Sequence, residues 1–565
     1  MYRLRPYSSR PGYPGRAAAL SLAFAAAWVS ALLPAQAHAQ SERESLESVR
    51  QTTLALIELL VQNGTLPRDK ADALLAEARR RADAAVAEAA KGEPPPVRVQ
   101  FVPQVVRDQI RNEVREEVLA RAKLERWGVP NATAEWTDRI AIEGDLRVRS
   151  QTDRAGSNNP SPQDFLSASL GGTTRAADFA TGTSTGLATG STQDDRDRER
   201  LRARLAITAK INDNVTAGLR LATGSASDRV STNQTLGQNF NRYQFLLDRA
   251  FIKLDPTEWV SVSAGRFANP WFSTDLVYDD DLNFEGVSAT FKRPLQPNSS
   301  WSPYATVGYF PVREVSGARR SRSLMGAQVG VQWEMSERTR LKFGLAQYRY
   351  AGFEGRTDPD YDALSGPGRS YGQYEYEAGL RQRGNTLFLT NNPQEIAGGL
   401  TPDKARWGLA SRFQPAALTV AAEFSHFAPF FVGLSGEVVR NTAFDRKEIF
   451  SRTGVQVDDA RNYGAGVRGT FGAQQVRNAG EWQVSLGYRW LGSDAVPDAF
   501  VDSDLALGGT NVRGVTAGLL YGVARDTQLG LRVLSGRTIS SPTVQPGLKD
   551  NFSVYSLQVD LNVRF

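Results

Sequence analysis

The sequence contains no cysteine and only two histidines, His38 and His426, among its 565 residues. The absence of cysteine excludes a disulfide framework, a thiol nucleophile and a thiolate metal site. His38 falls in an N-terminal leader described below, and His426 lies at the end of a predicted strand, where it is expected to be an interfacial or loop residue. One histidine neither forms a metal site nor completes a hydrolytic constellation. We therefore expect no enzyme activity, no cofactor and no bound metal.

The chain also lacks a long hydrophobic run and an excess of either charge. Its mean hydropathy of −0.38 argues against a helical membrane protein. It has 67 basic and 61 acidic residues, and four of the arginines lie in the first 40 residues. The remainder is nearly balanced, so the pI of 9.3 does not indicate a nucleic-acid partner.

The first 40 residues have the pattern of an export signal. Four arginines and no acid precede the apolar stretch 17–33, which is short for a membrane span and is followed by Pro34 and an Ala-x-Ala-x-Ala sequence. This pattern predicts a signal peptide over residues 1–39, cleaved after Ala37 or after Ala39.

Residues 40–128 show a helical period. An apolar stripe ends at Asn63-Gly64, Pro67 begins an Ala-rich helix that stops at Gly92, and a proline-rich linker precedes a third helix beginning at Pro103. We expect a helical hairpin, a stiff linker and a connecting helix. An oligomerising coiled coil is the alternative, although the stripe is short for one.

From Arg139 onward the apolar period is two. The closing segment shows it best, because its apolar residues alternate with polar ones from Tyr555 to the terminal Phe565. Such strands suit a wall with lipid on one side and water on the other. We predict about sixteen strands, at 139–149, 201–208, 215–221, 250–254, 260–264, 287–291, 305–309, 327–335, 341–345, 407–413, 418–424, 465–471, 482–490, 515–521, 529–533 and 555–565. A weaker candidate, 433–439, could add one more.

The connections between these strands are of two kinds that alternate. The short ones are predicted at 211–214, 255–258, 336–337, 415–416 and 524–526, and the long polar ones at 151–199, 224–243, 268–283, 352–403 and 428–462. This layout, with aromatic residues near strand ends, is typical of an outer-membrane β-barrel with short periplasmic turns and long external loops. The predicted fold is an all-β transmembrane antiparallel barrel over residues 129–565, preceded by a periplasmic helical segment over 40–128. A sixteen-strand barrel is wide enough to hold an aqueous channel.

Strand parity places a set of arginines on the non-lipid face, and one external loop is acidic. The arginines include Arg147, Arg149, Arg200, Arg202 and Arg204; the loop, 269–283, carries Asp275, Asp279, Asp280 and Asp281. If this loop folds inward, it would face the arginines and create a transverse field that selects solutes by charge. The alternatives are a solvated surface loop and a Ca²⁺ site at residues 279–281, for which an Asp-x-Asp spacing with a closing glutamate is not evident.

The mature chain resembles the putative porin family of Gram-negative outer-membrane proteins. Three stretches carry the resemblance, 56–77, 136–147 and 265–286, and the last is the most specific. The resemblance implies an outer-membrane channel, and analogy with general porins adds a homotrimer. The closing segment, with Tyr555 and Phe565, resembles the signal read by the barrel-assembly machinery.

Two functions remain open from the sequence. The first is a porin for passive diffusion of small hydrophilic solutes and ions, surrounded by outer-membrane lipid. The second is an adhesin or surface-binding barrel that acts through its long loops, 151–199 and 352–403. The helical segment could also contact peptidoglycan or hold a trimer together.

Overall fold

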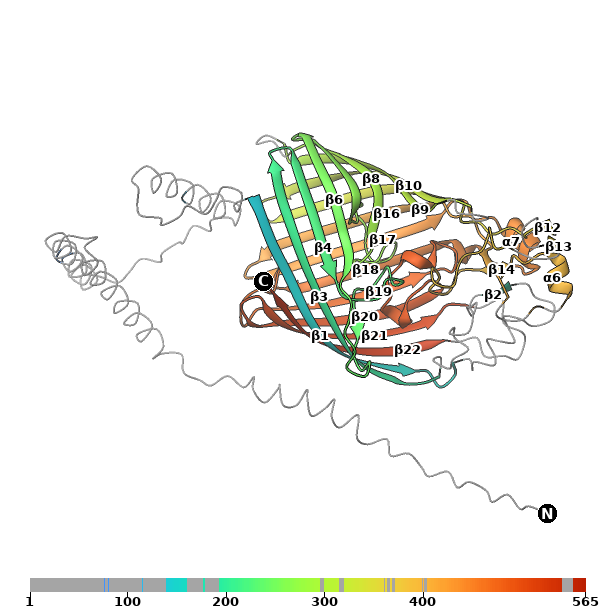
Figure 1. Cartoon of the computed structure of the whole chain (residues 1–565). Coiled ribbons are helices and arrows are strands. Elements are labelled where there is room, and N and C mark those ends of the chain that lie inside the picture. Colours follow the sequence, from blue (N-terminus) through green and yellow to red (C-terminus); the bar gives the residue numbers. More distant parts are fainter. Residues whose placement is uncertain are drawn as a thin grey trace, which may run out of the picture. The chain divides into compact units, whose positions relative to one another are not determined.

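A computed structural model gives the fold of the chain (Figure 1). The chain falls into two units, residues 1–128 and 129–565, and almost all described residues belong to the second. The structure describes residues 139–159, 193–294, 299–314, 320–359, 371–398, 404–540 and 552–565, with the short pieces 76, 80, 114, 176–177, 361–362, 366–367 and 400. The predicted signal peptide and, apart from three isolated helical residues, the predicted helical segment lie outside them. Among the described residues, no helix has the length and apolar character needed to cross a membrane.

The second unit is a closed antiparallel β-barrel of sixteen strands, as predicted. The two-residue β5 (Gln234–Thr235) also joins the sheet, but it lies within a loop. The barrel strands are β1 (Ile140–Ala155), β3 (Arg196–Asn212), β4 (Val215–Ala222), β6 (Leu246–Thr257), β7 (Val260–Ala268), β8 (Asn283–Lys292), β9 (Trp301–Arg313), β10 (Arg322–Ser336), β11 (Thr339–Ala351), β16 (Pro415–Phe427), β17 (Phe430–Asn441), β18 (Tyr463–Gly472), β19 (Trp482–Leu491), β20 (Val512–Ala524), β21 (Thr527–Thr538) and β22 (Ser553–Arg564).

One predicted strand is wrong and one weak candidate is a strand. Residues 407–413 do not enter the barrel, because Trp407–Leu409 forms β15 in a small three-stranded sheet with β14 (Leu387–Leu389) and β2 (Ala176–Ala177). Its apolar side chains are buried in that sheet, which mimics the pattern of a wall strand. The true strand is β17, whose alternation is weakened by Gly433 and Gly436.

The connections are of two kinds, as predicted, but the predicted long loop 428–462 contains β17 and is only residues 442–462. Short turns join β3 to β4, β6 to β7, β10 to β11, β16 to β17 and β20 to β21, and the fourth of these is residues 428–429 rather than 415–416. At the other end are longer loops, of which four matter below: L2 (223–245), L3 (269–282), L4 (352–414) and L7 (492–511). L4 carries α6 (Pro393–Ala397), β12 (Tyr361–Asp362), β13 (Gly366–Pro367), β14 and β15, and the next loop carries α7 (Arg446–Thr453) and η4 (Asp459–Asn462). Figure 1 shows these elements gathered at the end opposite the C-terminus.

The barrel closes where β1 pairs with β22, along residues 145–155 of β1 and 554–564 of β22. Phe565 extends this seam, since its N–H and C=O exchange hydrogen bonds of 3.1 and 2.8 Å with Gly144. The Phe565 ring lies over Gly144 so closely that a Cβ there would be 2.3 Å from it. The terminal aromatic and a glycine of the first strand thus complete the ring of strands.

The two faces of the wall follow the period of two. On β1, Ile142, Leu146 and Val148 are exposed on the outer face, whereas Arg149 is buried on the inner face. Outside, the apolar residues meet lipid. Stacked or tilted ring pairs lie at the ends of the outer face, such as Trp301 with Trp333 at 4.5 Å, as expected of interfacial girdles.

The principal hydrophobic core lies inside the barrel. Inward rings of β7 to β11 meet apolar residues of loops L3, L4 and L7; the rings include Phe267, Phe284, Phe310, Tyr348 and Tyr350. The loops are therefore packed into the barrel, and they position the site described next.

Candidate functional site in the barrel lumen

Loop L3 folds into the barrel and crosses it. Near its beginning, the backbone N–H and C=O of Phe272 bond to the side-chain amide of Gln328 on β10, both at 2.8 Å. Two residues later, the N–H and hydroxyl of Thr274 donate to Glu437 on β17 at 3.0 and 2.7 Å. Because Gln328 and Glu437 are inward residues of different strands, L3 spans part of the lumen rather than extending into solvent.

Aromatic packing holds the apolar side of L3. Trp271 contacts Tyr348 with ring centroids 5.4 Å apart, and Tyr278 contacts Tyr348 at 5.2 Å. The Trp271 ring also lies against β10, where a Cβ at Gly326 would be 2.7 Å from it. Each ring pair adds about 0.5–1.5 kcal/mol beyond burial, so L3 is fixed firmly to this wall.

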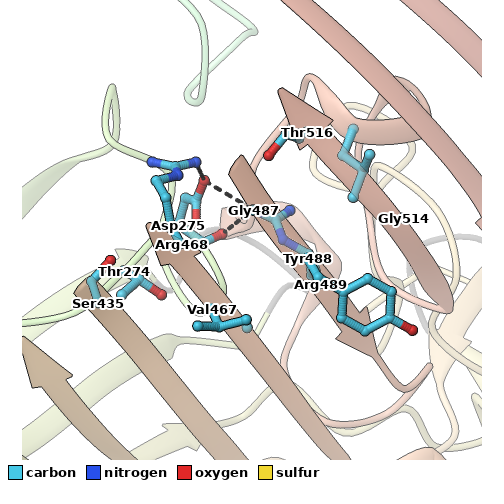
Figure 2. Close-up of a pocket in the computed structure, with 12 residues that line it drawn as sticks. Thr274, Asp275, Ser435, Val467, Arg468, Gly487, Tyr488, Arg489, Gly514 and Thr516 are labelled. Carbon is cyan, nitrogen blue, oxygen red and sulfur yellow. Dashed lines mark hydrogen bonds and ion pairs between the residues drawn. The ribbon is translucent and has the colours of Figure 1, made fainter. Parts of the chain in front are cut away.

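Asp275 pairs with two arginines at a different part of the wall. Its carboxylate lies 2.6 Å from Arg468 on β18 and 3.2 Å from Arg489 on β19 (Figure 2). These three residues line a pocket together with Thr274, Leu505 and Thr516. The two cations hold the pKa of the Asp275 carboxyl below its usual range despite its burial.

Asp281 is the residue of L3 that meets the predicted arginine ladder, which is formed by Arg200, Arg202 and Arg204 of β3. Arg204 lies 3.1 Å from Asp281 and also pairs with Asp145 on β1 at 2.6 Å. Arg202 pairs with the same Asp145 at 2.8 Å. Arg200 instead donates to the side-chain oxygen of Gln151, at 3.1 Å. Of the three arginines in the ladder, only Arg204 therefore pairs with the acidic loop.

Asp279 and Asp280 have no ion-pair partner among the described residues. The Asp279 carboxylate is buried and accepts from the backbone N–H of Asp281 at 2.7 Å and of Ser503 at 3.2 Å. Burial, followed by the nearby charge of Asp502, raises the pKa of Asp279 to about 9. Its proton makes Asp279 a neutral contact between L3 and L7. Asp280 is exposed.

Loop L7 also enters the lumen, which the sequence reasoning missed. Asp502 lies 3.0 Å from Arg489, and Asp504 lies 2.7 Å from Arg532 on β21 and 3.7 Å from Arg149. L7 contains the short helices η5 (Asp498–Phe500) and η6 (Leu505–Leu507), and its apolar residues are buried. The apolar content of L7 is unusual in a polar loop, and it is the sequence feature that could have predicted that L7 enters the lumen.

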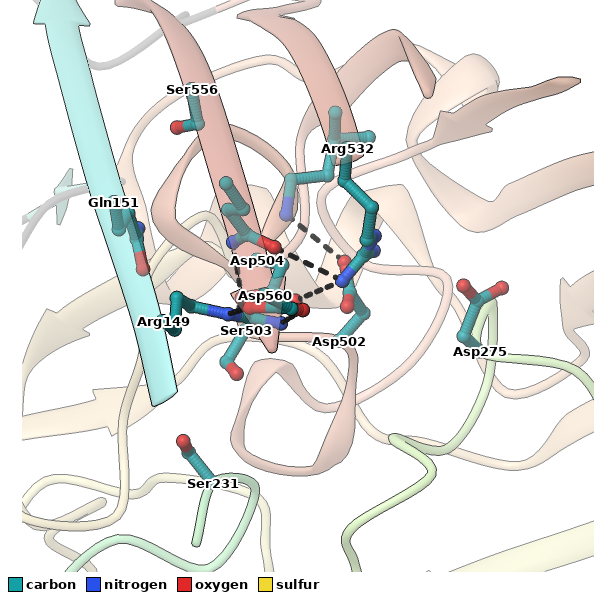
Figure 3. A network of polar contacts seen from close by, with 12 residues as sticks. Arg149, Gln151, Ser231, Asp275, Asp502, Ser503, Asp504, Arg532, Ser556 and Asp560 are labelled. Atoms are coloured by element: carbon teal, nitrogen blue, oxygen red, sulfur yellow. Dashed lines mark hydrogen bonds and ion pairs between the residues drawn. The ribbon is translucent and has the colours of Figure 1, made fainter. Parts of the chain in front are cut away.

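Arg149 belongs to a network, with Asp504 and Asp560 at its centre, that joins L7 to the barrel seam (Figure 3). Its guanidinium binds both oxygens of Asp560 on β22, at 2.7 and 2.9 Å. Asp504 links this pair to Arg532 and accepts from Gln558 at 3.2 Å. Paired side chains of this kind are costly to separate when buried.

Arg147 completes the set of predicted residues. Its terminal nitrogen donates to the side-chain oxygen of Asn233 in L2 at 2.5 Å. The structure thus brings Asp281 and all five predicted arginines to one side of the lumen, and Asp275 to another. Within the described part of the chain, no group of three or more histidine and acidic side chains is arranged to hold a metal ion.

A closed sixteen-strand barrel with inward loops and a polar, arginine-rich lumen defines an outer-membrane channel protein. The chain belongs to the family described as "Putative porin", whose model matches residues 50–565. A comparison with curated proteins found no match.

Solved structures of low sequence identity resemble the barrel. OprB of Pseudomonas putida has a TM-score of 0.40 and 10% identity, over 76% of this chain and 96% of that chain. The outer-membrane channel DcaP of Acinetobacter baumannii has a TM-score of 0.36 and 11% identity, over 76% and 98%. A loop L8 deletion mutant of OmpT of Vibrio cholerae has a TM-score of 0.38 and 10% identity, over 76% and 100%.

Proposed function

We propose that this outer-membrane channel passes small hydrophilic solutes and ions by passive diffusion, and that L3 together with L7 forms its charged constriction. The observation that carries the proposal is the course of L3, which bonds to β10 and β17, pairs with β18 and β19 through Asp275, and pairs with β3 through Asp281. A loop that is fixed at several places around the lumen narrows the channel without blocking it. Its charges then act on solutes at short range.

Conductance in a planar bilayer tests this function. The purified wild-type protein should give discrete steps of open current. Changing Asp279, Asp280 and Asp281 together to Asn should alter ion preference in a salt gradient, chiefly through Asp281 and the exposed Asp280. An unchanged ion preference would show that these aspartates are not part of the constriction, although the protein would still be a channel.

A surface-binding role is the second candidate, and the organisation of L4 favours it. This loop has buried residues of its own, including Phe353, Tyr376 and Trp407, and it forms a helix and short strands at the external end. A barrel that binds an external partner but gives no current steps would support this function over diffusion.

The remaining proposals concern assembly and partners. We expect the barrel-assembly machinery to read the closing strand, with Tyr555 and Phe565 on its outer face, and Phe565→Asp to reduce insertion before it affects transport. We also propose a homotrimer. Deleting residues 41–92 and measuring oligomer size and peptidoglycan binding would separate a trimer-holding helical segment from a tether.

A further inference from the structure

Seven arginines of β1 and β3 have inward parity. Arg196, at the start of β3, is exposed, and the other six line one side of the lumen with partners that differ. Four of them have carboxylates: Arg149 pairs with Asp560, Arg198 with Asp153, and Arg202 and Arg204 share Asp145. Arg147 and Arg200 bind only amide oxygens, those of Asn233 and Gln151. No carboxylate in the described residues lies within ion-pair distance of either.

The two arginines are close to each other. In the pairing of β1 with β3, Arg149 is opposite Arg200 and Arg147 is opposite Arg202, so Arg147 and Arg200 are diagonal neighbours on the inner face. Diagonal positions in an antiparallel pair are about 7–8 Å apart, within reach of long side chains. Their guanidinium groups turn apart, because Arg200 donates to Gln151, on the side of Arg149 away from Arg147, whereas Arg147 donates to Asn233. Each arginine therefore offers its remaining donors to an anion of its own.

Most of the nearest carboxylates are already engaged; the exception is Asp228 near Arg200, which accepts from the backbone N–H of Val230. Asp560 is held by both guanidinium bonds of Arg149, Asp504 by Arg532 and Arg149, and Asp281 by Arg204. The Nε atoms of both Arg147 and Arg200 are buried and have no hydrogen-bond partner in the described structure. A buried N–H donor without an acceptor is costly, and a bound anion would supply the acceptor.

We propose that Arg147 and Arg200 form an anion-binding subsite of two neighbouring positions in the channel, each suited to a small solute that carries a carboxylate or phosphate group. This proposal deepens the proposed function and rests on it for its role in transport. Guanidinium groups recognise both kinds of anion through paired N–H donors. Each side chain retains partial exposure, so a solute in the lumen can reach it. The channel should accordingly prefer anions.

Reversal potentials in a KCl gradient measure this preference. Wild type should be more permeable to chloride than to potassium. Arg147→Gln and Arg200→Gln should each lower that ratio by about threefold, the effect of one partly screened charge. The matched control is Arg525→Gln in a periplasmic turn, whose side chain is 90% exposed and outside the lumen; it should leave the ratio unchanged.

A second variant keeps both arginines and so avoids any effect of removing them. Asn233→Asp is nearly isosteric and supplies a carboxylate at the atom that Arg147 already contacts. It should lower the chloride preference as Arg147→Gln does, whereas Arg147→Lys, which keeps the charge, should preserve most of it. Equal ratios in wild type, Arg147→Gln and Asn233→Asp would overturn the subsite.

Binding of inorganic phosphate, measured by calorimetry on the detergent-solubilised barrel, separates this proposal from the proposed function. Phosphate binding that Arg147→Gln and Arg200→Gln each weaken, in a protein without current steps, would support the subsite and refute the channel. Current steps without anion preference or phosphate binding would support the channel and refute the subsite.

Discussion

The lumen has two unlike walls. On the side of β7 to β11, inward rings such as Phe284, Phe310 and Tyr348 pack against Trp271 and Tyr278 of L3. On the side of β18 to β22, β1 and β3, inward arginines pair with aspartates from L3, L7 and the strands. The rings of the aromatic wall are buried and should contribute most of the stability of the inner loops. The charged wall carries the arginines of the proposed constriction, and two of them, Arg147 and Arg200, bind amide oxygens instead of carboxylates.

The largest expected effect comes from the aromatic wall. Trp271→Ala removes a ring that is 5% exposed and contacts both Phe310 and Tyr348, so the free energy of unfolding should fall by about 3–5 kcal/mol. Denaturant unfolding in detergent measures this change, and open-channel conductance should rise because L3 is released. Phe240→Ala, at a fully exposed loop residue, is the control. An unchanged conductance would mean that the charged wall alone holds L3.

A smaller effect is expected where L3 meets the charged wall. Asp275→Asn leaves Arg489 without one of its two carboxylates, and this arginine side chain is only 9% exposed. Breaking a partly buried pair should cost about 1–3 kcal/mol, less than a fully buried one, because Asp502 still compensates Arg489. The same unfolding measurement checks it, and current noise should increase. If Asp275→Asn cost more than Trp271→Ala, the assignment of stability to the aromatic wall would be wrong.

The smallest effect should be a dependence on pH at the contact between L3 and L7. The pKa of Asp279 is raised to about 9 by burial and by Asp502, with further contributions from Asp281 and Asp504. A raised pKa means that the folded state holds the proton. The stabilisation is therefore complete below the unfolded pKa of about 3.9 and is lost as pH rises through about 9.

Raising the pH from 7 to 10 should thus loosen this contact and increase gating events in single-channel records. Asp279→Asn cannot ionise, so it should remove that part of the increase. A variant that responds to pH as wild type does would assign the response to another group.

Much of the barrel could be predicted because each strand carries its own evidence. The outer face of each wall strand meets lipid, and the inner face of many strands is polar, so the segment itself shows a period of two, as from Tyr555 to Phe565. The strand count was right, yet β17 and β15 were confused. Glycines weaken the alternation of β17. Burial within a loop gives β15 an apolar pattern, although β15 is not part of the wall.

The site could be predicted only in part. Parity placed five arginines inward, and the acidic residues of L3 suggested that this loop folds into the lumen; the arginines are Arg147, Arg149, Arg200, Arg202 and Arg204. The sequence did not indicate that Asp275 and Asp281 pair with different parts of the wall, nor that L7 supplies Asp502 and Asp504. The separations along the chain range from 13 residues for Arg489 and Asp502 to 193 for Asp275 and Arg468. Each pair joins a loop to a strand of the wall, and no local pattern specifies which strand the loop meets.

The sequence by itself determined the barrel, its closing strand and the inward face of its arginines, because alternation between lipid and water is a local property of each strand. Only the tertiary structure decided which charges cancel. Arg149 meets Asp560 across 411 residues of sequence, whereas Arg147 and Arg200 meet only amides. Electrostatic pairing depends on distance in space, and closure of the barrel and folding of its loops set that distance.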